Sequence, residues 1–141
     1  MNNVAVPIDD ARDALWASAQ VIELYRREPV SIHLVNVQPP LSRHVSQFLN
    51  SRDIRAFHLE AGMQVLQPAI RALDSAGVPH KDHVLVGRKV DSIVHFANEY
   101  SCSQVILDNR SEGLLSVLGL GSIASQIRRA IAGSAEKVRP S

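Results

Sequence analysis

Two kinds of apolar segment alternate along this chain and limit the folds open to it. Short β-branched runs cover residues 4–8, 30–37, 78–86 and 104–108, and segments with apolar residues at every third or fourth position lie between them. The run 30–37 is nearly continuous in its hydrophobicity, as expected for a strand covered on both faces. Strands that alternate with helices favour a parallel sheet with right-handed crossovers. The sequence therefore predicts an α/β fold with helices on both faces of the sheet.

The helices are expected at 11–28, 54–73, 90–100 and 122–133. Asp9 or Asp10 can cap the first of them, and Gly77 stops the second. One further helical turn is expected within 41–51, after the two prolines that end the second strand. The tail 135–141 predicts a weak fifth strand, because only Ala135 and Val138 are apolar and Pro140 ends it. With 141 residues the chain predicts a single domain, 1–141, arranged as a three-layer sandwich.

Composition excludes several classes of function. The single cysteine, Cys102, allows no internal disulfide and cannot by itself form a structural metal site. The formal net charge is +1, so no overall field recruits nucleic acid or a membrane surface. No apolar run is long enough to span a bilayer, and the N-terminus leads directly into a strand without a signal peptide. These observations predict a cytoplasmic protein with neither nucleic-acid nor membrane partners.

The stretch 108–122 carries opposing signals about an anion site. A strand runs into a loop that ends in Gly121-Ser122 at the start of a helix, where free N–H groups and the helix dipole favour a phosphate. Asp108, Ser111 and Glu112 place two carboxylates and Cβ atoms where such a loop would need glycines. If the first and fourth strands are neighbours, this loop and Asp9 meet at the carboxyl edge of the sheet, where such folds bind ligands.

Several motifs together resemble the universal stress protein family over almost the whole chain. They are Val-Pro-Ile-Asp at 6–9, a long segment after the second strand, Val86-Gly87 after the third, and a loop ending in Gly121-Ser122. The resemblance implies a five-stranded, mostly parallel sheet of order 3-2-1-4-5. It also implies a homodimer, commonly formed through the last strand, and a stress-response role in which some members bind ATP and others do not.

ATP-binding members carry Gly-x2-Gly-x9-Gly-Ser/Thr, and this chain matches only its last part. Counting back from Gly121 and Ser122, the two earlier glycines fall on Asp108 and Ser111. Asp9 matches the aspartate that contacts the base, and Val37 falls where the second strand offers its main chain to adenine. The site that the resemblance implies is therefore a degenerate nucleotide site comprising Pro7, Ile8, Asp9, Val37, Leu107, Asp108, Arg110, Ser111, Gly121, Ser122, Ile123 and Ala124.

These departures predict weak or absent ATP binding. Cβ atoms at 108 and 111 narrow the approach to the phosphates, and Asp108 adds repulsion of roughly 1 kcal/mol or more. The expected function is binding or signalling without turnover, with ATP or AMP as candidate ligands and magnesium only alongside ATP. The alternative is an ATP-binding member with slow hydrolysis, which requires Arg110 and Gly121-Ser122 to rescue the loop. The polar tail makes dimerisation through the last strand less favourable, which leaves the apolar stretch 114–120 or the end of the helix at 122–133 as the expected contact.

Other functional interpretations have weaker support. A dinucleotide-binding fingerprint can be matched to 119–124, but it lies too far behind its strand. The lysine that a P-loop requires is missing, which excludes a P-loop NTPase. A phospho-receiver domain would need an aspartate where Gly87 stands. His80 and Asp82 would share one face of a strand while His83 points to the other, which argues against a shared metal. Cys102 and His33 are expected to be buried, the histidine with a hydrogen-bond partner.

Overall fold

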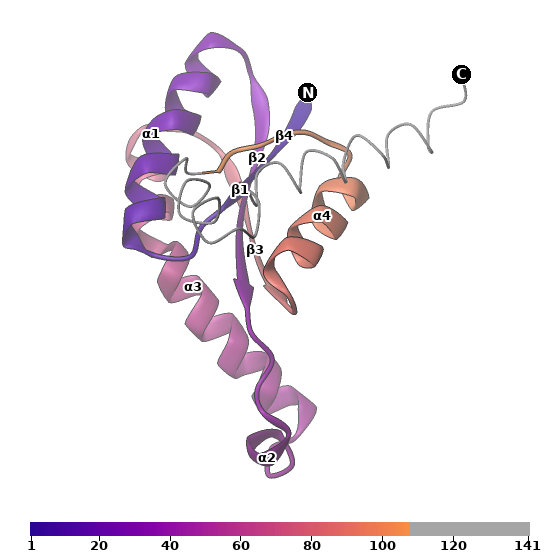
Figure 1. Ribbon diagram of the computed structural model, residues 1–141. Helices are drawn as coiled ribbons and strands as arrows, with labels where there is room; N and C mark the ends of the chain where they lie inside the picture. Colours follow the sequence, from indigo (N-terminus) through magenta and orange to yellow (C-terminus); the bar gives the residue numbers. More distant parts are fainter. Residues whose placement is uncertain (108–141) are drawn as a thin grey trace, which may run out of the picture.

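The computed structural model describes residues 1–107, and these form four parallel strands with helices on both sides (Figure 1). The strand order is β3-β2-β1-β4, which agrees with the first four positions of the expected order. The expected fifth strand and last helix lie outside the described residues. The elements are β1 (Asn2–Pro7), α1 (Ala11–Arg27), β2 (Val30–Gln38), α2 (Arg43–Ser46), α3 (Ser51–Ser75), β3 (His80–Val86), α4 (Lys89–Glu99) and β4 (Cys102–Val105).

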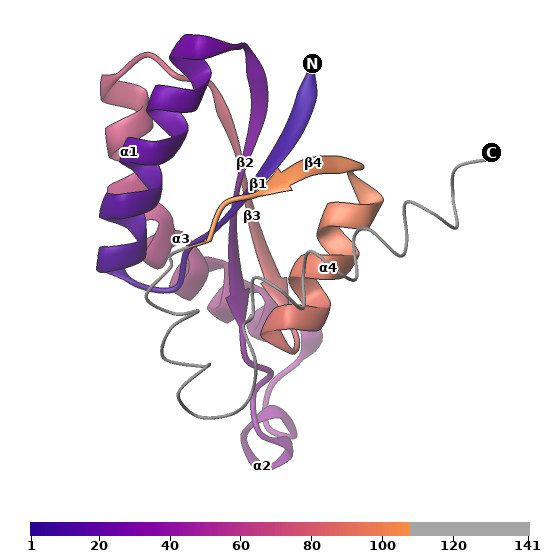
Figure 2. The same cartoon turned by 45° about the horizontal axis from the view of Figure 1, so that its top comes forward.

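Helices α1 and α3 cover one face of the sheet and α4 covers the other (Figures 1 and 2). The α1/α3 side holds the larger core, in which alternate residues of β1 and β2 meet apolar residues of both helices. The α4 side packs Phe96 and Ala97 against Ala5, Val35 and Cys102. The three layers predicted from the alternating pattern are thus present in the described part of the chain.

Local signals explain where the first two long helices begin and end. Asp10 caps α1, because its side chain accepts a hydrogen bond from the Asp13 N–H at 2.8 Å. Asn50 caps α3 in the same way, because its side-chain oxygen accepts a hydrogen bond from the Asp53 N–H at 2.8 Å. Gly77 follows α3 with a φ of 71°, a left-handed conformation that glycine adopts without strain. The predicted extra turn within 41–51 is also present, as α2.

The fourth strand begins earlier than the sequence predicted. The expectation was 104–108, based on the apolar residues 105–107, whereas β4 spans Cys102–Val105. Ser101 takes a φ of 51°, so the chain turns sharply after α4, and Cys102 pairs at once with Asn3. Main-chain bonding continues past the strand, because the Ile106 N–H donates to the Ala5 carbonyl at 2.9 Å. Pairing with β1, and not hydrophobicity, sets the start of this strand.

Candidate functional site

The order of the strands reverses between β1 and β4, and this defines the edge at which a ligand site is expected. Pro7 and Ile8 are buried where β1 ends, and Asp9 emerges into solvent. Leu107, the last described residue, follows β4 along the same edge and is half-buried. The structure therefore brings together the described members of the predicted site that follow β1 and β4.

A buried asparagine holds the end of β1 in place. The Ile8 N–H donates to the Val35 carbonyl at 2.9 Å, and the Asn36 Nδ2 donates to the Ile8 carbonyl at 2.8 Å. Gln38 donates in turn to Asn36 Oδ1 at 2.7 Å. Both polar groups of the Asn36 amide are thereby satisfied in a buried position. Asn36 was missed by the sequence analysis, although one amide within an otherwise apolar strand is a signal that could have revealed it.

The main chain of Val37 faces the ligand edge. The Val35 carbonyl accepts from β1, whereas the Gln38 carbonyl accepts from the Gly87 N–H beyond β3 at 3.0 Å. Successive residues of a strand present their main-chain groups to opposite sides, so Val37 turns towards the β1 side. The β1–β2 pairing ends at Pro7 and Val35, and Val37 therefore lies beyond the last paired residue of β1. This is the orientation that the predicted contact with a base requires.

Asp9 forms an ion pair that the sequence did not predict. The Lys89 ammonium, on the first residue of α4, donates a hydrogen bond to Asp9 Oδ2. Both side chains are 35% exposed, so the pair lies at the surface of the edge. A cation in the first turn of a helix opposes the helix dipole, which is the signal that could have drawn attention to Lys89. The carboxylate that the resemblance assigns to a base is thus occupied by a side chain of the protein.

The start of α1 is acidic and internally bonded. The Asp9 N–H donates to Asp13 Oδ2 at 3.1 Å, while Asp10 caps the helix. Burial raises the pKa of Asp13; the hydrogen bond from the Asp9 main chain opposes this rise, and the neighbouring charges of Asp10 and Asp9 add to it. This helix end therefore carries negative charge, which disfavours a phosphate there. The resemblance assigns a phosphate to the loop between 108 and 124, which lies outside the described residues.

Seven predicted site residues belong to that loop. They lie outside the described residues, and their place in the site remains a prediction. They are Asp108, Arg110, Ser111, Gly121, Ser122, Ile123 and Ala124.

The residues behind the weaker functional interpretations have structural roles in the described part of the chain. His80 Nδ1 lies 2.6 Å from Asp82 Oδ1, whereas His83 Nε2 lies 2.9 Å from His33 Nδ1 on the α4 side of the sheet. The predicted division of these side chains between two faces is thus confirmed, as is the buried, hydrogen-bonded state of His33. Cys102 is also buried, and burial raises the pKa of its thiol to about 11, which makes it a poor nucleophile.

A parallel α/β sheet with a ligand edge at its strand reversal defines a class of small binding proteins, and sequence comparison narrows that class. Residues 1–132 match the profile of the universal stress protein family. The chain therefore belongs to the universal stress protein family. No curated protein sequence matches it significantly.

Solved structures agree with this fold. A universal stress protein in complex with cAMP is similar to the chain with a TM-score of 0.71 and 17% identity, over 92% of this chain and 90% of the other. A family protein from Burkholderia pseudomallei has a TM-score of 0.64 and 16% identity, over 91% and 88%. The universal stress protein from Archaeoglobus fulgidus in complex with dAMP has a TM-score of 0.55 and 25% identity, over 74% and 78%.

Proposed function

We propose that this chain is a small-ligand-binding or signalling module of the stress response that binds adenine nucleotides only weakly and does not turn them over. Structures similar to the chain hold cAMP and dAMP, which supports adenine nucleotides as the ligand class. The cytoplasmic location and the homodimer expected from the sequence are part of the same proposal. No helix within residues 1–107 is long and apolar enough to cross a membrane.

The ion pair between Asp9 and Lys89 is the observation that carries the proposal. An adenine that approached the carboxyl edge would need the Asp9 carboxylate as an acceptor for its amino group, and Lys89 already occupies it. Binding must therefore break this pair before it gains a new hydrogen bond. A surface ion pair of this kind contributes at most about 1 kcal/mol, so it weakens binding without abolishing it. The losses expected from Asp108 and Ser111 add to this effect.

Replacing the lysine tests this account with a ligand that has no phosphate. Lys89→Met frees the Asp9 carboxylate, and we expect adenosine affinity to rise by up to about fivefold, the equivalent of about 1 kcal/mol. Arg88→Met is the matched control, because this exposed neighbour makes no ion pair within the described residues, and it should leave the affinity unchanged. Isothermal titration calorimetry with adenosine measures both.

Two results would count against the proposal. A lower adenosine affinity in Lys89→Met would mean that the lysine contacts the ligand and does not compete with it. Failure of adenosine and AMP to bind any variant, including Lys89→Met, would remove adenine compounds from the ligand class altogether.

A further inference from the structure

The chain between β2 and the middle of α3 forms a protrusion without a core of its own. We call residues 41–59 the α2–α3 knob; it lies beyond the end of the sheet, at the foot of the molecule in Figure 1. Helix α2 has no buried residue, and the first buried residue of α3 is His58. The residues from 41 to 57 are therefore all exposed or half-buried. Packing against the rest of the described chain does not account for the apolar side chains placed here.

Local hydrogen bonds give the knob a defined shape in spite of this. The Ser42 hydroxyl accepts from the Val45 N–H at 3.3 Å at the start of α2, and the Phe48 N–H donates to the Val45 carbonyl at 3.2 Å. Asn50 then caps α3 through the Asp53 N–H at 2.8 Å. Capping of this kind fixes the ends of helices without burying apolar surface. The knob is thus a preformed surface, which lowers the entropic cost of binding a partner.

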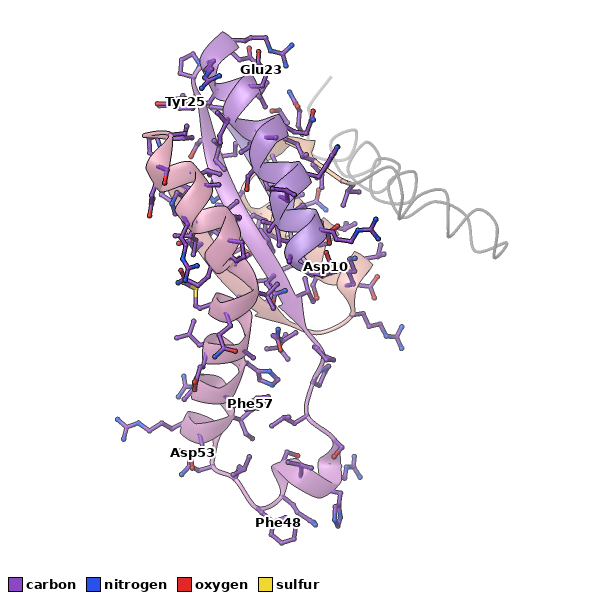
Figure 3. The ribbon with its side chains drawn as sticks, turned by 90° about the vertical axis from the view of Figure 1, so that its left-hand side faces the viewer. Asp10, Glu23, Tyr25, Phe48, Asp53 and Phe57 are labelled. Carbon is purple, nitrogen blue, oxygen red and sulfur yellow. The ribbon has the colours of Figure 1, made fainter. Side chains whose placement is uncertain are left out.

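Large apolar side chains are exposed at several points of the knob, with Phe57 and Leu59 on opposite sides of α3. Phe48, at the far tip, is 74% exposed, and Phe57, on the first turns of α3, is 51% exposed (Figure 3). Val45, Leu49 and Leu59 are also exposed. Single exposed apolar residues are ordinary, but several within one short segment are typical of a site of interaction.

The charge of the knob indicates what kind of partner it fits. Between residues 42 and 59 there are three arginines, Arg43, Arg52 and Arg55, against one carboxylate, Asp53. Within residues 1–107 none of these arginines forms an ion pair. Arg52, Arg55 and Leu59 are spaced at i, i+3 and i+7, which places them on one face of α3. A complementary partner would present carboxylates beside apolar side chains.

Three occupants can be compared on these grounds. A bilayer is disfavoured, because recruitment to anionic lipid takes about four to eight clustered basic residues and the knob has three. A second copy of the chain is disfavoured, because a symmetric contact would bring arginines against arginines. Phenylalanine and arginine are enriched in protein interfaces, and the guanidinium group pairs with carboxylates in a two-pronged geometry. We propose that the α2–α3 knob docks an acidic amphipathic helix of another protein.

A synthetic helical peptide with leucines along one face and glutamates along the other tests this proposal on the full-length chain. NMR titration should show shifts confined to the amides of residues 41–59, and the peptide should bind at least about tenfold more tightly than a twin in which lysines replace the glutamates. Phe48→Ser should weaken binding about tenfold, and so should Arg52→Gln combined with Arg55→Gln. Leu15→Ser is the matched control, because Leu15 is 79% exposed but lies on α1, and it should bind as the unchanged protein does.

Several outcomes would overturn the proposal. Equal affinity for the two peptides would show that the arginines do not select acidic partners. Unchanged peptide affinity in Phe48→Ser would show that the exposed apolar side chain does not contribute to binding. Sedimentation with phosphatidylserine vesicles that depends on Phe48 would assign the knob to a membrane. Self-association that Phe48→Ser abolishes would assign it to a second copy of the chain. All of the substituted side chains are exposed, so circular dichroism should show that the variants remain folded.

Discussion

At the scale of single residues, a hydrogen-bonded pair of histidines, His33 and His83, stabilises the α4 side of the sheet. Asn3 donates through Nδ2 to the Tyr100 carbonyl at 2.7 Å, which turns its Oδ1 towards His33 Nε2 at 3.1 Å. His33 Nε2 must therefore donate, and His33 Nδ1 accepts from His83 Nε2. Phe96 and Tyr100 pack around both rings. Protonation of both rings would set two N–H groups against each other, because His33 Nδ1 and His83 Nε2 would then both carry hydrogen.

Acid should therefore weaken the fold through this pair. Burial lowers the pKa of His33, and the charge of His83 and then of Lys81 lowers it further. Burial also lowers the pKa of His83, opposed by Asp82 and aided by Lys81. The unfolded chain then binds these protons more readily, so the contribution is complete above about pH 6.5 and is lost as the pH falls towards the folded pKa values.

His83→Asn isolates this contribution. We expect the variant to be less stable than the original chain by about 1 kcal/mol at pH 8, because one partly buried hydrogen bond is lost. The deficit should narrow by about pH 5, where only the original chain bears the cost of protonating His83. Urea unfolding at both values measures it, and exposed His95→Asn is the control. A deficit that grows in acid would contradict this account of the pair.

The contribution of His80 to stability has the opposite pH dependence, so His80 must be kept in both proteins of the His83→Asn comparison. Burial by itself would lower its pKa, but hydrogen bonds with Asp74 and Asp82 outweigh this effect and raise the pKa. The stabilisation from His80 is therefore complete below about pH 6.5 and is lost as the pH rises through the raised pKa. Because His80 is present in both proteins of the His83→Asn comparison, its contribution cancels to first order. Only the difference between the two stability profiles reports on the pair of His33 and His83.

At the scale of elements, α3 packs tightly against β3 at a glycine, Gly62. A Cβ built on Gly62 would lie 2.5 Å from both Cγ atoms of Val84, a β-branched side chain held in the sheet. Glycine in a helix costs up to about 1 kcal/mol relative to alanine, so the sequence accepts a weaker helix in exchange for close packing. The apolar periodicity predicts this helix but not the reason why position 62 is small, because the contact joins residues that are distant in sequence.

Gly62→Ala should destabilise the protein by about 1–3 kcal/mol through overpacking, less the gain in helix propensity. Val84→Ala removes the methyl groups that the new Cβ would meet. Gly62→Ala should therefore cost less stability when it is added to Val84→Ala than when it is added to the original chain. Thermal unfolding followed by circular dichroism measures the set. Independent, additive effects of the two substitutions would show that the residues do not collide.

The sequence predicted the elements better than the contacts between them. Periodicity and caps sufficed to identify α1, α3 and the strands β1, β2 and β3, because each has its own local signal, although β3 begins at His80 and not at residue 78. The start of β4 was wrong, because pairing with Asn3 sets it. At the site, Asp9 and Val37 were placed by the resemblance, while Asn36 and Lys89 were missed. Their roles depend on neighbours 28 and 80 positions away, which no local pattern encodes.

At the scale of the whole molecule, the proposed dimer is expected to depend on the apolar stretch 114–120 and not on the tail. An edge strand joined by main-chain hydrogen bonds gains little, because each bond replaces one to water, whereas a buried leucine contributes roughly 1.5–3 kcal/mol. Deleting residues 137–141 should therefore leave a dimer intact, while Leu115→Asp with Leu118→Asp should shift it to monomer. Light scattering distinguishes the two, and monomers after the deletion alone would restore the strand-mediated interface.

Nucleotide affinity is the central claim, and titration of the unchanged chain with ATP in the presence of magnesium tests it most directly. Calorimetry should give a dissociation constant above the micromolar range, because Lys89 occupies Asp9 and because residues 108 and 111 are not glycines. Asp108→Gly with Ser111→Gly should raise the affinity. Tight, magnesium-dependent binding of ATP to the unchanged chain would contradict the account.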